Sequence, residues 1–129
     1  EVHILDDEGV RVSATCVRVP VLRAHTEALH LEFDHTVDPE EAGSILADAV
    51  GLQVVADPQP IDASGGDEVL VGRIRRDHGI PEGRGLAMLV SGDQLRKGAA
   101  LNAVQIAEHL TSTPRTHLTD VGDIPSQLP

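Results

Sequence analysis

The chain has 129 residues, and 21 Asp and Glu against 10 Lys and Arg give it a formal net charge of −11 at pH 7. This length predicts a single domain with a modest core, and the acidic charge disfavours binding to nucleic acid or to an anionic membrane surface. One Phe and no Tyr or Trp leave an aliphatic core, no window of about 18 to 20 apolar residues predicts a membrane span, and the single Cys favours a reduced, cytoplasmic protein.

The first predicted strand runs from Val10 to Val21, where β-branched residues alternate with small or polar ones. Pro20 lacks the N–H that a strand ladder needs, so it marks an edge, a bulge or a break. The residues before this strand read like the end of a helix that enters a turn at Gly9, and we therefore expect further chain upstream.

A second strand and a helix follow. From Ala28 to Asp34 polar and apolar residues alternate, which predicts a half-buried strand with one wet face. Asp38 as N-cap, Pro39 at the first helical position and Glu41 three residues after the cap predict a helix start. The helix is predicted to end at Gly51, with an inward stripe of Ala42, Ile45, Leu46 and Ala49.

The middle of the chain predicts two strands, over residues 52–55 and 69–75, with a turn-rich loop over 57–66 between them. Alternation in the longer strand predicts two faces. One face carries Val69, Val71 and Arg73, and the other carries Leu70, Gly72 and Ile74.

The last part of the chain predicts a wide hairpin connection over 77–85, a strand over 86–90 and a helix from about Lys97 to Thr111. The inward stripe of this helix is predicted to be Leu101, Val104, Ala107 and Leu110. Residues 113–129 have no hydrophobic period, and we interpret them as a mobile tail.

Five strands and two helices in the order ββαβββα predict an α+β fold. We expect a largely antiparallel or mixed sheet with both helices on one face. The predicted domain covers residues 1–112, and the tail over 113–129 follows it.

Arg18 and His25 are the first candidate site residues. A guanidinium can bind a carboxylate with two hydrogen bonds and an imidazole can move a proton near neutral pH, which together suit a site for a small acid. In a straight strand their Cα atoms would be about 23 Å apart and their side chains would point to opposite faces. A shared site therefore requires a bend or bulge between Pro20 and Ala24. The structural alternative is that Arg18 covers a sheet face and His25 ends a strand.

Cys16 lies in an apolar run with no helix N-terminus beside it, which favours a buried, unreactive thiol over a nucleophile. A second polar set, His30, Glu32, Asp34 and His35, offers zinc or manganese ligands, but a solvated strand face is the favoured interpretation and no metal site is predicted.

Six cations hold most of the positive charge in this acidic chain: Arg73, Arg75, Arg76, Arg84, Arg96 and Lys97. They form either an anion-binding strip, for a phosphate or the 2′-phosphate of NADP, or a set of partners for carboxylates across a dimer. We favour the second interpretation.

A long series of residues resembles aspartate-semialdehyde dehydrogenase, in the C-terminal half of that family. The series begins with a signature made of Val12, Ser13, Cys16, Arg18, Val19, Ala24, His25 and Thr26. It continues in the family's order through Asp67 to Asp77 and Leu86 to Glu108, so the resemblance covers roughly positions 1 to 112. The signature departs from the family at Ala24, where Gly, Ser or Cys is usual.

The resemblance implies a domain that dimerises through its sheet and faces an upstream nucleotide-binding domain, which would hold most of the NADP. The implied reaction is the NADP-dependent conversion of L-aspartyl-4-phosphate into L-aspartate-4-semialdehyde, in the pathway to lysine, threonine and methionine. Arg18 would bind the α-carboxylate of the substrate, His25 would act as acid and base, and Asn102 would lie near the nicotinamide amide. The family's nucleophilic cysteine lies in an upstream Asn-Cys motif that this chain does not contain, so we expect no turnover by the 129 residues alone.

Two partnerships and one alternative function follow from the resemblance. The chain is expected to form a homodimer or to pair with an upstream or full-length dehydrogenase subunit, around a small acidic substrate. The alternative is a free-standing, catalytically silent module that dimerises with a complete paralogue or senses a small acid. The sequence leaves open whether the chain is itself an enzyme.

Overall fold

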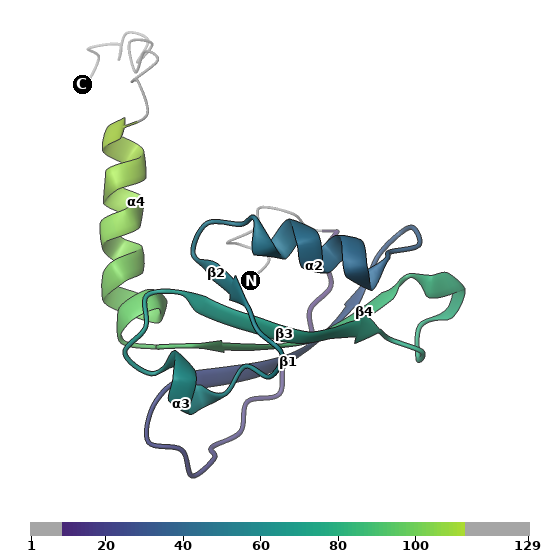
Figure 1. Cartoon of the computed structure of the whole chain (residues 1–129), viewed down its shortest axis with the longest axis horizontal. Helices are drawn as coiled ribbons and strands as arrows, with labels where there is room; N and C mark the ends of the chain where they lie inside the picture. Colours follow the sequence, from purple (N-terminus) through teal and green to yellow (C-terminus); the bar gives the residue numbers. More distant parts are fainter. Residues whose placement is uncertain (1–8, 113–129) are drawn as a thin grey trace, which may run out of the picture.

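A four-stranded sheet is the centre of the computed structural model, which describes residues 9–112. The strands are β1 (His25–Glu32), β2 (Leu52–Val54), β3 (Val69–Arg76) and β4 (Gly85–Gly92), in the spatial order β1-β4-β3-β2. Helix α2 (Pro39–Ala47) lies on one face of the sheet and the short α3 (Pro60–Ala63) on the other (Figure 1).

The sheet is mixed. β1 and β4 pair antiparallel, with His25 opposite Gly92 and Glu32 opposite Gly85. β3 and β4 also pair antiparallel, and β2 joins β3 in parallel. The predicted α+β class with a mixed sheet is therefore confirmed, and the 77–85 connection is the expected wide hairpin, with a 3-10 turn at Pro81–Gly83.

The main core lies between the sheet and α2. Val71, Leu86 and Met88 are buried there, and partly buried side chains from β1 and α2 pack against them, among them Leu29, Leu31, Ala42 and Leu46. The alternation in β1 explains this arrangement, because Leu29 and Leu31 face the core while His30 and Glu32 are exposed.

Helix α2 begins as predicted. The carboxylate of Asp38 accepts a hydrogen bond from the backbone N–H of Glu40 at 3.0 Å, and Pro39 occupies the first turn. Gly51 follows the helix with a φ of 81°, a conformation that glycine adopts without strain. Ile45 is exposed, so only part of the predicted stripe faces the core.

A β-bulge corrects the predicted faces of β3. Gly72 pairs with Leu89 and Arg75 pairs with Ala87. Between these two pairs β3 contains one residue more than β4, which defines a bulge. Arg73 takes up the extra length with a φ of 53°. Ile74 is thereby turned to the face of Val71 and packs in the main core, whereas simple alternation placed it on the opposite face.

Two predicted elements differ from the structure, and a third lies outside the described residues. Residues 10–21 form no strand; they run as an extended, exposed segment. The 57–66 loop contains the single turn of α3, which covers Leu70 with the buried Ala63. The predicted tail at 113–129 lies outside the described residues.

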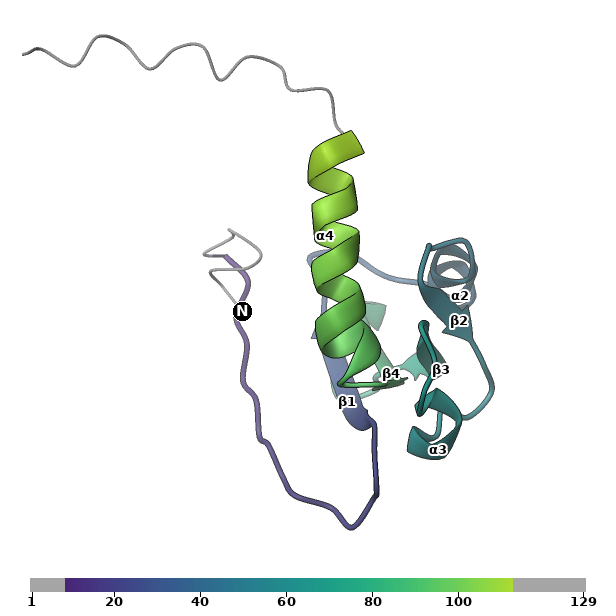
Figure 2. The same ribbon diagram turned by 90° about the vertical axis from the view of Figure 1, so that its left-hand side faces the viewer.

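The last helix leaves the sheet instead of covering it. A π-helical turn, Arg96–Ala100, continues into α4 (Leu101–Ser112), which projects away from the sheet (Figure 2). Val104 and Leu110, two residues of the predicted inward stripe, are exposed. No helix within residues 9–112 is long and apolar enough to span a membrane.

Candidate functional site

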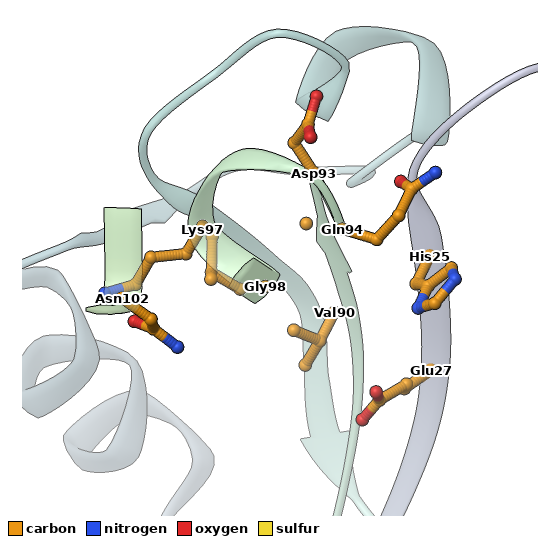
Figure 3. Close-up of a pocket in the computed structure, with 10 residues that line it drawn as sticks. His25, Glu27, Val90, Asp93, Gln94, Lys97, Gly98 and Asn102 are labelled. Atoms are coloured by element: carbon orange, nitrogen blue, oxygen red, sulfur yellow. The ribbon is translucent and has the colours of Figure 1, made fainter. Parts of the chain in front are cut away.

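An open pocket of about 380 Å³ lies where the ends of β1 and β4 meet the start of the last helix (Figure 3). It is on the α2 face of the sheet, next to the main core, because the side chains of Glu27, Val69 and Val90 on its floor share that face with Leu29 and Val71. Its lining residues are His25, Glu27, Val69, Val90, Gly92, Asp93, Gln94, Lys97, Gly98 and Asn102.

Two walls of the pocket carry different chemistry. His25 and Glu27 come from β1, and because they are two residues apart in one strand they lie on the same face. Lys97 and Asn102 come from the π-helical turn and the first turn of α4, on the other side of the pocket (Figure 3). An imidazole therefore shares one cavity with an amide and an amine side chain.

Lys97 is held by its own helix. Its Nζ donates a hydrogen bond to Oε1 of Gln105 at 2.7 Å. Lys97 is the only Lys or Arg among the pocket's lining residues.

Asp93 is the most connected side chain at the pocket, and it is completely buried. Its Oδ1 accepts hydrogen bonds from the backbone N–H groups of Leu95 and Arg96, at 2.8 and 2.9 Å, and so caps the start of the helix. Its Oδ2 accepts from the N–H of Gly65 at 2.6 Å and forms an ion pair with Nε of Arg23 at 2.7 Å.

These contacts set the ionisation of Asp93. Burial raises the pKa of the carboxyl, but the hydrogen bond from Gly65, the contact with Arg23 and the bonds from Arg96 and Leu95 outweigh it. The pKa of Asp93 therefore lies well below its usual range, and the carboxylate stays charged at neutral pH.

This pKa makes the stability of the chain sensitive to acid. Because the carboxyl binds its proton more weakly in the folded state, its stabilising contribution is present above about pH 4 and is lost as the pH falls further. Asp93→Asn is expected to lower the midpoint of thermal unfolding at pH 7 by about 5–10 °C, with the difference from the parent chain narrowing towards pH 3. Circular dichroism melts at pH 7, 4 and 3 measure this.

The matched control is Asp67→Asn, because Asp67 pairs with Arg96 through an exposed carboxylate. We expect this control to leave the midpoint nearly unchanged at each pH. Asp77, whose pKa is lowered by its hydrogen bond with His30, still contributes to acid sensitivity in both variants. If the difference in unfolding midpoint between Asp93→Asn and the parent chain stays constant down to pH 3, the lowered pKa of Asp93 is wrong.

The chain bends sharply just before His25. Residues 20, 22 and 23 are bends, Ala24 has a φ of 74°, and the segment at 10–19 runs back along a different path from β1 (Figure 2). The bend required for a shared site is therefore present. However, Arg18 is exposed and is not among the residues that line the pocket, whereas His25 and Asn102 both are.

Cys16 and the polar set around His30 are the other candidate residues. Cys16 is exposed on the extended segment, so the prediction of a buried thiol is wrong for the described structure. Within residues 9–112 no three His, Cys, Asp or Glu side chains gather closely enough to hold a metal ion. His30 instead pairs with Asp77, with Nδ1 2.6 Å from Oδ2.

Several of the six cations pair within the chain. Arg84 contacts Glu32 at 3.0 Å, Arg96 contacts Asp67 at 2.5 Å, and Arg73 lies 3.7 Å from Asp57. Their carboxylate partners in this structure are intramolecular, and pairs across a dimer stay a prediction.

Sequence reasoning missed Asp93 and Gln94. Asp93 could have been recognised as a capping residue, because an Asp before a helix commonly accepts hydrogen bonds from the N–H groups two and three residues further on, as it does here from Leu95 and Arg96. Gln94, which accepts a hydrogen bond from the N–H of Ala24 at 2.8 Å, gave no local signal, because its partner lies 70 residues away in the chain.

Comparison with known proteins identifies the family. The sequence profile for the family described as "Semialdehyde dehydrogenase, dimerisation domain" matches residues 1–97. The aspartate-semialdehyde dehydrogenase of Corynebacterium melassecola is 53% identical over 107 residues, which cover 83% of this chain and 31% of that protein. The enzyme of the same name from Mycolicibacterium smegmatis is 52% identical over 109 residues, which cover 84% and 32%.

A solved structure supports the same relationship. The crystal structure of aspartate semialdehyde dehydrogenase II from Vibrio cholerae, complexed with ASA, matches with a TM-score of 0.80 and 40% sequence identity. The match covers 88% of this chain and 34% of that one. The likeness thus extends from sequence to fold.

The chain belongs to the semialdehyde dehydrogenase family, through its dimerisation domain. Within that family it matches the C-terminal portion of aspartate-semialdehyde dehydrogenase, as the signature around Arg18 and His25 predicted. It spans about a third of the length of the curated relatives that it matches.

Proposed function

We propose that this chain supplies one wall of the active site, and the dimer surface, of an aspartate-semialdehyde dehydrogenase. The reaction is the NADP-dependent conversion of L-aspartyl-4-phosphate into L-aspartate-4-semialdehyde and phosphate. The observation that carries the proposal is the joint placement of His25 and Asn102 in one open pocket, in a chain of this family. The domain is residues 1–112, and the enzyme is cytoplasmic.

His25 is the acid and base of the proposed site. Its side chain stands at the start of β1, exposed at the pocket rim, where an incoming substrate can reach the imidazole. The same pocket wall carries Glu27. A histidine placed in this way can take a proton from an attacking thiol and return one to the developing product.

Arg18 binds the substrate α-carboxylate in this proposal. Its guanidinium is exposed and belongs to a segment that forms no helix or strand within the described residues, so it is free to form a two-pronged contact with a carboxylate. The bend at residues 20–24 turns this segment back before β1, which brings Arg18 nearer to His25 than a straight strand would.

Asn102 contributes to the binding of NADP. A pocket of about 380 Å³ fits the nicotinamide end of the cofactor, and the amide of Asn102 can hydrogen-bond a carboxamide there, with Lys97 as a nearby positive charge. The remainder of the cofactor is held by another domain of the dehydrogenase. When bound, NADP supplies or accepts the hydride.

The dimer forms through the sheet face opposite α2. Helix α3 covers only one end of this face, and Ala28 and His30 of β1 are exposed beyond it (Figure 1). A second copy packed there would bury apolar surface such as Ala28 and the half-buried Leu89, which the single chain leaves open to solvent.

The proposal is tested by assembling the dehydrogenase from parts. The purified chain alone should not reduce NADP in the presence of phosphate and aspartate semialdehyde, because the nucleophilic cysteine of the family is implied in an Asn-Cys motif that the 129 residues lack. Co-expression with the remaining two-thirds of a related dehydrogenase should restore turnover. Activity of the chain alone contradicts the proposal, and binding of aspartate without turnover in the assembled protein favours a silent sensing module.

A further inference from the structure

We propose that Asp93 and Gln94 are positioning residues that fix His25 relative to the wall formed by Lys97 and Asn102. The inference rests on the proposed role of His25 as acid and base. It concerns two consecutive side chains at the end of β4, neither of which needs to touch the substrate to act.

Asp93 joins three segments through one buried carboxylate. Oδ1 caps the helix that carries Lys97 and Asn102, through the N–H groups of Leu95 and Arg96. Oδ2 holds Gly65 by its N–H and Arg23 by its guanidinium. One charged group therefore connects the helical wall of the pocket to the turn that leads into β1.

Gln94 completes the connection to β1. Its side chain extends from the end of β4 towards the strand that carries His25 (Figure 3), and its Oε1 accepts the N–H of Ala24 at 2.8 Å. Ala24 has a positive φ, which is unfavourable for a residue with a Cβ, and it is buried against Ala63 and Leu70. The hydrogen bond that Ala24 donates to Gln94 therefore holds a strained residue in place directly before His25.

The position of His25 depends on these contacts. Arg23 and Ala24, the two residues before it, are bound by Asp93 and Gln94, and His25 itself pairs across the sheet with Gly92. The turn that carries Lys97 is capped by the same Asp93 carboxylate. A change at residue 94 therefore alters the spacing between the two walls without removing any group that lines the helical wall.

The test is NMR of the 129-residue chain carrying Gln94→Leu, which keeps the size of the side chain and removes the acceptor. We expect the Ala24 amide to exchange with solvent about tenfold faster and the ring resonances of His25 to shift. The ring signals of His35 and His78, away from the pocket, should stay in place. Gln94→Glu keeps an acceptor oxygen, so it should restore protection of the Ala24 amide.

The matched control is Gln53→Leu, the same substitution at an exposed position in β2, which should leave His25 and Ala24 unchanged. An unchanged His25 signal in Gln94→Leu overturns the inference. Equal shifts of His25, His35 and His78 with a general loss of stability also overturn it, because they show only a structural role. The NMR measurement does not depend on turnover. It can therefore confirm the positioning role of Gln94 even if kinetics of a His25 variant show that the proposed catalytic role is wrong.

Discussion

His25→Asn, in a complete dehydrogenase that carries this chain, is expected to lower kcat by about 10²- to 10⁴-fold. Asn keeps the size and polarity of the side chain at the pocket rim but cannot accept and return a proton near neutral pH. His25 is exposed, so the substitution should change the free energy of unfolding by less than about 0.5 kcal/mol. Steady-state reduction of NADP with aspartate semialdehyde and phosphate measures the loss.

The control for this experiment is His78→Asn. His78 is an exposed histidine in the hairpin connection between β3 and β4, outside the pocket. The substitution should leave kcat within about twofold of the parent value, as expected for a surface change away from the site. If both variants retain the parent kcat, His25 does not move the proton, and the pocket has a binding role alone.

Only part of the candidate site could be predicted from the sequence. His25 and Asn102 were found through the family resemblance, and the structure brings them into one cavity although 77 positions separate them. Arg18 was found in the same way but does not line that cavity. Its segment makes no strand pairing within residues 9–112, so nothing in the described fold fixes where its side chain points.

The contacts that build the pocket were harder to predict because they are distant in sequence. Asp93 contacts Gly65 and Arg23, and Gln94 contacts Ala24. A buried carboxylate with several donors has the same local sequence as an exposed one, so composition and spacing do not reveal its burial. Only the helix-capping role of Asp93 has a local signal.

The fold was predictable from the sequence wherever a local sequence pattern matches the burial of its side chains in the structure. The N-cap of α2 and the alternation in β1 are local features, and both are confirmed. The bulge at Arg73 is not local, because it depends on how β3 meets β4, and it turned Ile74 to the other face.

The remaining errors share one physical cause. The stripe on α4 and the alternating segment before Pro20 both predict burial, yet Val104, Leu110, Val17 and Val19 are exposed. Hydrophobic periodicity indicates which side chains require a partner surface, but it does not indicate whether that surface belongs to the same domain. We expect the other domain and the second subunit of the proposed dehydrogenase to supply those surfaces.

Gly72→Ala is expected to destabilise the chain by about 3 kcal/mol, at the upper end of the usual cost of overpacking. A Cβ at residue 72 would overlap the backbone oxygen of Val55 and lie 2.7 Å from Cδ of the buried Pro58, where the chain crosses under β3. Because the first of these is a backbone atom, the strand or the crossing segment must move. Urea unfolding followed by far-ultraviolet circular dichroism measures the loss, since the chain has no Trp or Tyr to report by fluorescence.

Gly43→Ala provides a control of opposite sign. Gly43 lies inside α2, and a Cβ there would rest 3.8 Å from Cδ1 of Ile74, an ordinary packing distance. The added methyl should raise the free energy of unfolding by about 0.5–1 kcal/mol, because alanine favours a helix interior over glycine. If Gly72→Ala is too unstable to purify, the double variant with Gly43→Ala keeps the comparison measurable. Equal unfolding midpoints for the two single variants would show that Val55 and Pro58 do not pack against Gly72 as described.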